Sequence, residues 1–127
     1  MHNRILIVDD SEIVRDTIRV LLTSAGFNVC GEAHNGLAAI EKAQELKPDL
    51  IVLDLAMPVM DGGHTASVLK KMMPDVFVVF FTMYEESTCG ALASAAGVDV
   101  VLSKADGIGQ LLRCARGLLD DSEATPM

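Results

Sequence analysis

Residues 4–10 read Arg-Ile-Leu-Ile-Val-Asp-Asp, a run of four branched apolar residues that ends in two carboxylates. A short apolar run without polar alternation is typical of a strand buried on both faces, as in parallel sheets covered by helices. Further runs of this kind, rich in Val, Ile and Phe, follow at 28–33, 50–53, 76–81 and 98–102. The sequence therefore predicts five strands of one parallel sheet.

The segments between these runs have apolar residues at helical spacing. In the first segment Ser11 can cap a helix and Gly26 follows its end. Its expected buried stripe consists of Ile13, Val14, Ile18, Leu21 and Leu22. The second helix is expected at 36–46, with Leu37, Ile40 and Ala43 facing inward, and the others at about 63–73, 87–96 and 108–119. Five strands alternating with five helices predict an α/β, doubly wound fold with right-handed crossovers.

Size, charge and cysteine content exclude several functions. A chain of 127 residues fits one domain, and its formal net charge of −8 repels nucleic acid backbones and anionic lipid. We therefore expect no direct nucleic acid binding and no membrane binding. The three cysteines are widely spaced, and no apolar run is long enough for a membrane span or a signal peptide. These features predict reduced thiols and a cytoplasmic location.

Polar residues with useful chemistry stand where the predicted strands end. Asp9 and Asp10 follow the first strand, Asp54 the third, Thr82 the fourth and Lys104 the fifth. Because the carboxyl ends of parallel strands open onto one edge, we expect these side chains in one cleft. Three neighbouring carboxylates repel one another unless a cation intervenes, and Mg²⁺ prefers such oxygen ligands.

The same cleft has the groups that phosphoryl transfer requires. Lys104 and the metal would attract a phosphoryl group, and Thr82 could donate a hydrogen bond to it. Asp54, alone at the tip of the central strand, is the best placed nucleophile and would become an aspartyl phosphate. Taken singly, each aspartate is explained as a turn or capping residue and Lys104 as a surface lysine. Their ordered combination favours a functional site.

Five motifs carry a resemblance to a known family: Ile5–Asp10, Leu53-Asp54, Met57-Pro58 with Asp61-Gly62, Phe81-Thr82 and Leu102–Lys104. Together they resemble the receiver domain of bacterial two-component response regulators, especially receivers attached to helix-turn-helix domains. The resemblance covers residues 4 to about 119. It implies a flavodoxin-like sheet with strand order 2-1-3-4-5, a receiver domain over 1–119 and a polar tail or linker start at 120–127.

The resemblance also implies roles for single residues. Asp54 would be the phosphoacceptor and would bind Mg²⁺ together with Asp10, Asp9 (largely through water) and the backbone carbonyl of Ala56. Thr82 and Lys104 would contact the phosphoryl group. The switch region would comprise Thr82, Met83, Tyr84 and Val101.

Two positions depart from the usual family pattern. Val101 stands where an aromatic residue is common, so the usual aromatic gate cannot operate. Ala105 replaces the common proline after Lys104, and we expect a trans peptide there because a cis bond without proline costs about 3–4 kcal/mol.

The expected function is that of a signalling receiver that accepts a phosphoryl group from a sensor histidine kinase or a phosphotransfer protein. Phosphorylation would change the surface formed by the fourth helix, fifth strand and fifth helix, and so control an output such as transcription through a domain outside this chain. The same surface is a candidate for homodimer formation. Catalysis would be limited to self-phosphorylation and slow self-dephosphorylation, so the chain is not expected to be an enzyme.

Three alternatives remain. An aspartyl-phosphate phosphohydrolase of a related α/β fold would carry a second acid two residues after the nucleophile, where this chain has Ala56. An interaction module that has lost phosphorylation would not need the intact set of Asp10, Asp54, Thr82 and Lys104. A nucleotide-binding sheet would need a glycine-rich phosphate loop after the first strand, and the sequence has none there.

Overall fold

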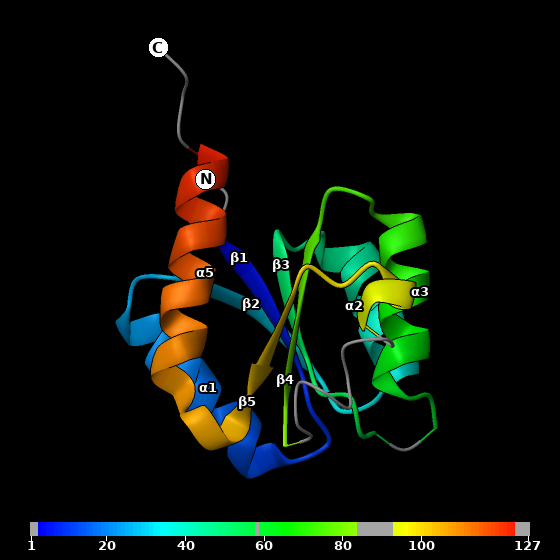
Figure 1. The fold of residues 1–127 in the computed structure, drawn as a ribbon, viewed down its shortest axis with the longest axis horizontal. Helices are drawn as coiled ribbons and strands as arrows, with labels where there is room; N and C mark the ends of the chain where they lie inside the picture. The colour runs from blue at the N-terminus through cyan, green and yellow to red at the C-terminus, as the bar shows by residue number, and fades with distance from the viewer. Residues whose placement is uncertain (1–2, 58, 84–92, 124–127) are drawn as a thin grey trace.

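A five-stranded parallel sheet forms the centre of the structure (Figure 1). The computed structural model describes residues 3–57, 59–83 and 93–123, without the side chains of 120–123. The strands are β1 (Arg4–Val8), β2 (Asn28–Ala33), β3 (Leu50–Leu53), β4 (Phe77–Thr82) and β5 (Val100–Ser103). All four strand pairs are parallel and the order is β2-β1-β3-β4-β5. This is the flavodoxin-like order, and the predicted fold class is confirmed.

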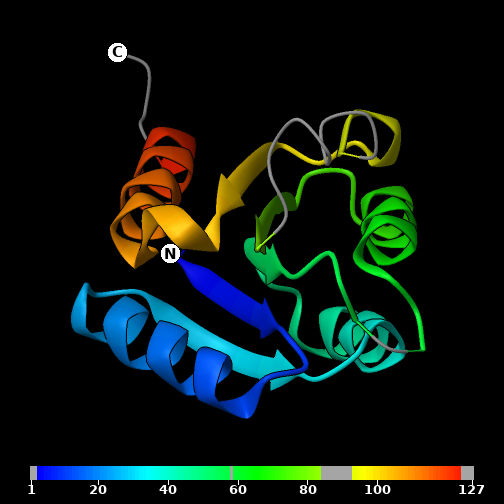
Figure 2. The same ribbon diagram turned by 60° about the horizontal axis from the view of Figure 1, so that its bottom comes forward.

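Helices cover both faces of the sheet, as Figures 1 and 2 show. On one face lie α1 (Glu12–Ser24) and α5 (Ile108–Glu123), and on the other α2 (Gly36–Leu46) and α3 (Gly62–Met72). Residues 93–96 are helical and lie on the same side as α3, whereas the rest of the helix expected at 87–96 is outside the described residues. Helix α5 continues to Glu123, four residues past the predicted end at Leu119.

Each inner strand contributes to two hydrophobic cores. Ile5 and Ile7 of β1 belong to the core under α1 and α5, whereas Leu6 and Val8 belong to the core under α2 and α3. All four side chains are at most 1% exposed. Burial on both faces explains why the sequence of β1 is a continuous apolar run rather than an alternating one.

The predicted inward-facing sets of α1 and α2 are wrong at one position each. Ile13 is 79% exposed and Leu37 is 49% exposed. At 3.6 residues per turn, Ile13 is rotated by about 140° from the buried Ile18, and Leu37 by about 120° from the buried Ala43. Both residues therefore lie well outside the buried face of their helix, where the sheet does not cover them.

The fifth strand begins two residues later than predicted because Asp99 serves as an anchor. Its carboxylate Oδ2 accepts a hydrogen bond from the backbone N–H of Val78 at 2.8 Å and lies 3.3 Å from Lys70 Nζ. The strand starts only after this contact, at Val100.

In the part of the chain that the structure describes, no helix has both the length and the hydropathy to cross a membrane. Cys30 and Cys114 are free, half-buried thiols.

Candidate functional site

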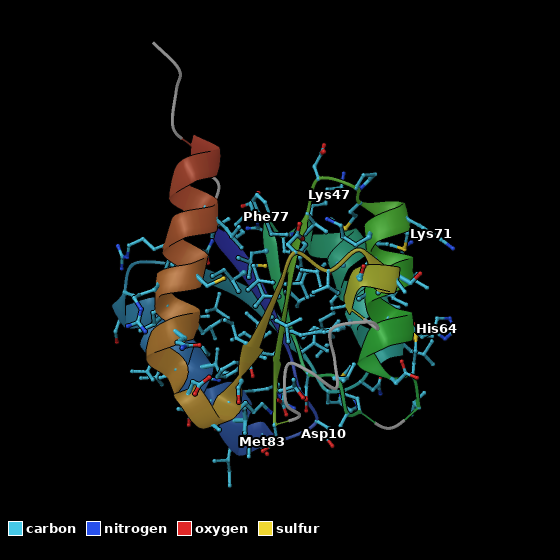
Figure 3. The ribbon with its side chains drawn as sticks, viewed as in Figure 1. Asp10, Lys47, His64, Lys71, Phe77 and Met83 are labelled. Atoms are coloured by element: carbon cyan, nitrogen blue, oxygen red, sulfur yellow. The ribbon has the colours of Figure 1, made fainter. Side chains whose placement is uncertain are left out.

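The carboxyl ends of the strands place the predicted polar residues at one end of the molecule. Asp10, just after β1, and Met83, just after β4, lie at this end in Figure 3, whereas Lys47 and Phe77 lie at the opposite end. The parallel ladder continues to the edge, since the N–H of Asp9 donates to Ala33 O at 3.1 Å and that of Asp54 to Val8 O at 3.0 Å.

Three carboxylates form a cluster at this edge. One oxygen atom each of Asp9, Asp10 and Asp54 lies within 4.8 Å of the other two. Asp9 is 2% exposed and Asp54 is 7% exposed, whereas Asp10 is exposed. The cluster is therefore closed at its base and open to solvent beside Asp10.

Lys104 provides a positive charge to the two buried carboxylates. Its Nζ lies 2.6 Å from Asp9 Oδ2 and 3.5 Å from Asp54 Oδ2. Pairing of Thr82 with Ser103 in the β4–β5 ladder brings Lys104, the next residue, to the edge beside β4. Ser103 Oγ accepts from the N–H of Ala105 at 3.1 Å, and the Lys104–Ala105 peptide is trans, as predicted.

Thr82 ends β4 and is fully buried. Its pairing with Ser103 places Thr82 beside the end of β5, directly before Lys104. Among the other residues of the predicted switch region, Met83 is 69% exposed, and Val101 is half-buried and packs on the core under α2 and α3. Tyr84 lies outside the described residues.

The surroundings of Asp54 raise the pKa of its carboxyl group. Burial is the main cause, and the charge of Asp9 acts in the same direction. The charge of Lys104 and the N–H of Ala56, 3.4 Å from Asp54 Oδ1, act in the opposite direction. The negative charge of Asp54 is thus incompletely compensated, so an additional cation at this cluster would be favourable.

The donor atoms of the cluster fit a hard divalent cation. Carboxylate oxygens from three residues, one of them open to water, match the preference of Mg²⁺ for a few carboxylates and several waters. Ala56 is exposed beside Asp54, and a contribution from its carbonyl oxygen stays a prediction.

The segment after Asp54 is held close to the cluster by the Asp61-Gly62 motif. Gly62 N–H donates to Leu55 O at 2.8 Å, and Asp61 caps α3 by accepting from His64 N at 2.8 Å. A Cβ atom at Gly62 would collide with Asp54 O and lie 2.6 Å from Leu55 Cα. Glycine is therefore required for this close backbone approach.

Two charged residues that lie beside the acidic cluster were not identified from the sequence. Arg15 is only 16% exposed at its side chain and donates to the carbonyl oxygen of Asp9 at 2.6 Å. Glu32, in β2, pairs with the same guanidinium at 3.2 Å. The signal was a glutamate within the predicted strand at 28–33, where a partly buried charge requires a partner.

Comparisons with known proteins agree with this geometry. The model of the response regulator receiver domain family matches residues 5–116. Response regulator protein VraR of Staphylococcus saprophyticus is 40% identical over 117 residues, which are 91% of this chain and 56% of VraR. The chain thus spans little more than half the length of that relative.

Solved structures show the same architecture. A two-component response regulator of the LuxR family from Aurantimonas has a TM-score of 0.87 at 28% identity, over 93% of this chain and 85% of the other. Response regulator TrrA of Thermotoga maritima, in complex with Mg²⁺-BeF, has a TM-score of 0.84 at 27% identity, over 92% and 99%. With the matched family, the sheet order and the acidic edge in agreement, this chain belongs to the response regulator receiver domains of two-component systems.

Proposed function

We propose that this chain is a phosphorylation-dependent switch in which Asp54 accepts a phosphoryl group from a sensor histidine kinase or a phosphotransfer protein. The observation that supports this most is the arrangement around Asp54, a buried carboxylate that lies close to Lys104 and to two further carboxylates. An aspartate that serves only in a turn does not require a lysine and two further carboxylates beside it.

The residues of the cluster would hold Mg²⁺, with Asp10 and Asp54 as ligands, Asp9 acting largely through water, and the Ala56 carbonyl completing the set. The TrrA structure, which contains Mg²⁺ and a beryllium fluoride group, supports this assignment. When bound, the metal would neutralise charge on the phosphoryl oxygens.

In the transfer step a carboxylate oxygen of Asp54 forms a bond to phosphorus while the bond from phosphorus to the donor atom breaks. The donor keeps the bonding electron pair. Lys104, already 3.5 Å from Asp54, would pair with a phosphoryl oxygen, and the Thr82 hydroxyl would donate a hydrogen bond to another.

The output surface is proposed to comprise β5, α5 and the helix between β4 and β5, because β5 connects directly to Lys104. Phosphorylation would bias two arrangements of the segment after Thr82, and a partner protein or a second copy of the chain would bind one of them better. A cytoplasmic location, where a kinase can reach the site, is part of this proposal.

The phosphohydrolase alternative is less well supported. It requires a second acid two residues after the nucleophile, and that position is Ala56 with an exposed methyl side chain. We therefore propose slow loss of the phosphoryl group rather than turnover of substrates.

Acetyl phosphate tests the proposal directly. Incubation with Mg²⁺ is expected to add one phosphoryl group to the wild-type chain, as measured by intact mass, and none to Asp54→Asn. Asp61→Asn is the matched control, because it changes a nearby exposed carboxylate to a residue that still caps α3. Labelling of Asp54→Asn to the wild-type level, or no labelling of the wild type, would overturn the proposal.

A further inference from the structure

Arg15 contacts the backbone of the acidic cluster rather than its side chains. Its Nη1 donates to the carbonyl oxygen of Asp9 at 2.6 Å, and this oxygen belongs to the peptide that joins Asp9 to Asp10. Because a peptide unit is planar, a contact that fixes its oxygen also fixes the direction in which the chain enters Asp10.

Every other polar group of Asp9 also has a partner. Its N–H donates to Ala33 O at 3.1 Å, its Oδ1 accepts from Ser11 N–H at 2.9 Å, and its Oδ2 lies 2.6 Å from Lys104 Nζ. Asp9 is thus held on all sides, whereas the side chain of Asp10 is exposed. The orientation of Asp10 therefore depends on the peptide that Arg15 holds.

Arg15 is itself held in place by β2. Its Nε donates to Glu32 Oε1 at 3.2 Å, and the second oxygen of Glu32 accepts from Arg19 Nη1 at 2.8 Å. Glu32 is paired in register with Ile7, two residues before Asp9. A planar guanidinium that bonds at two edges has little rotational freedom, so the contact with Asp9 is well defined.

We propose that Arg15 is a positioning residue of the cation site. By holding the Asp9–Asp10 peptide it directs the Asp10 carboxylate toward Asp54 and so raises the affinity of the cluster for a divalent cation. This inference rests on the proposed function, since it assumes that the cluster binds Mg²⁺. Residues that orient metal ligands typically change metal affinity by about tenfold or more when they are replaced.

The test compares Arg15→Gln with Arg19→Gln. Both variants remove one partner of Glu32, but Arg19 contacts Glu32 and Asp16 rather than Asp9. Mg²⁺ is titrated into each variant by calorimetry without any phosphoryl donor, and thermal unfolding is measured in EDTA. We expect the Kd of Arg15→Gln to rise about tenfold, and that of Arg19→Gln to stay within about twofold because it leaves the Asp9 contact intact.

Two further variants keep the test decisive if Arg15→Gln folds poorly. Arg15→Lys retains the charge and one donor, so it should recover part of the lost affinity. Glu32→Gln weakens the clamp on Arg15 and should weaken Mg²⁺ binding less than Arg15→Gln does. Acetyl phosphate labelling of Arg15→Gln should be slow at low Mg²⁺ and reach the wild-type rate at saturating Mg²⁺.

The outcomes separate the two proposals. If the wild type binds Mg²⁺ and is phosphorylated, but Arg15→Gln and Arg19→Gln have equal Kd and equal losses of stability, Arg15 only supports the fold and this inference is wrong. If the wild type binds no Mg²⁺ and takes no phosphoryl group, the proposed function fails and the inference fails with it.

Discussion

The ammonium group of Lys104 is nearer to Asp9 (2.6 Å) than to Asp54 (3.5 Å). The lysine thus neutralises first a carboxylate of the cation cluster and only second the proposed nucleophile. Lys104 and a bound divalent cation would therefore compete for the negative charge of Asp9. Binding of the cation would weaken the ion pair of Lys104 with Asp9 and leave the lysine free to pair with Asp54.

Lys104→Met should have opposite effects on stability and metal binding. Without metal, loss of the partner of buried Asp9 is expected to cost about 3 kcal/mol of unfolding free energy. With its competitor removed, Mg²⁺ should bind more tightly than to the wild type. Urea denaturation in EDTA and in Mg²⁺ checks both effects, with Lys71→Met, an exposed lysine of α3, as the control. Weaker Mg²⁺ binding by Lys104→Met would contradict the competition.

The effect of Asp10→Ala on stability should change sign when Mg²⁺ is added. In EDTA the variant should be at least as stable as the wild type, because it removes one of three clustered negative charges. In Mg²⁺ it should be the less stable protein, because a ligand is lost and less binding free energy is added to folding. Asp75→Ala, an exposed acid outside the acidic cluster, should show no such reversal. Equal Mg²⁺ affinities of Asp10→Ala and the wild type would place the metal elsewhere.

The raised pKa of Asp54 predicts how stability depends on pH. Because the folded chain binds the proton of Asp54 more tightly than the unfolded chain does, this group stabilises the fold at low pH. That contribution is lost as the pH rises through the raised pKa. In EDTA at pH 7, Asp54→Asn should therefore be more stable than the wild type, and the difference should shrink as the pH falls through the raised pKa. Denaturation midpoints across this range measure it, and a difference that grows toward low pH would contradict the assignment.

Two adjacent glycines provide a matched pair for the backbone behind Asp54. Gly62→Ala places a methyl group 2.6 Å from Leu55 Cα and should cost about 2 kcal/mol or more, because backbone atoms cannot give way easily. Gly63→Ala meets only Asp61 Oδ1 at 3.4 Å and should be neutral or stabilising, by up to about 1 kcal/mol, since alanine favours the helix. Urea denaturation of the two variants decides the matter. If they are equally stable, the close approach at Gly62 is not a constraint.

The lifetime of the phosphoryl group should be long, from many minutes to hours. Ala56 is exposed beside Asp54 and has no polar group to align an attacking water, and Tyr84 follows Thr82 by two residues in the sequence. Ala56→Asn combined with Tyr84→Glu should shorten the lifetime about tenfold if about 1.4 kcal/mol of the barrier is removed. Loss of phosphoprotein after removal of the donor measures this, with Val59→Asn as a control in the same segment. A wild-type half-life of seconds would refute it.

The sequence was sufficient to predict the fold and the gathering of Asp9, Asp10, Asp54 and Lys104 at one edge of the sheet. Asp9 and Asp54 directly follow an apolar run, and Lys104 follows one after Ser103; a parallel sheet must bring such positions to one edge. Because each of these residues stands at the end of a strand, the sheet topology determines where its backbone lies.

What could not be predicted depends on the rotation of helices and on side chains that meet across elements. The contact of Arg15 with Asp9 requires α1 to turn Arg15 toward β2, and the exposure of Ile13 reflects the same rotation. The preference of Lys104 for Asp9 over Asp54 is set by differences of about an ångström, which no sequence pattern encodes.

The distance along the chain between Asp9 and Lys104 has a consequence for synthesis. The two residues are 95 positions apart, and the lysine directly follows the last strand of the sheet. During translation the carboxylates of Asp9 and Asp54, which follow β1 and β3, emerge long before the ammonium group of Lys104. A nascent or truncated chain that ends before Lys104 therefore lacks part of this cluster. If Asp54 accepts a phosphoryl group as proposed, a fragment without this lysine is expected not to compete with the complete domain for the phosphoryl donor.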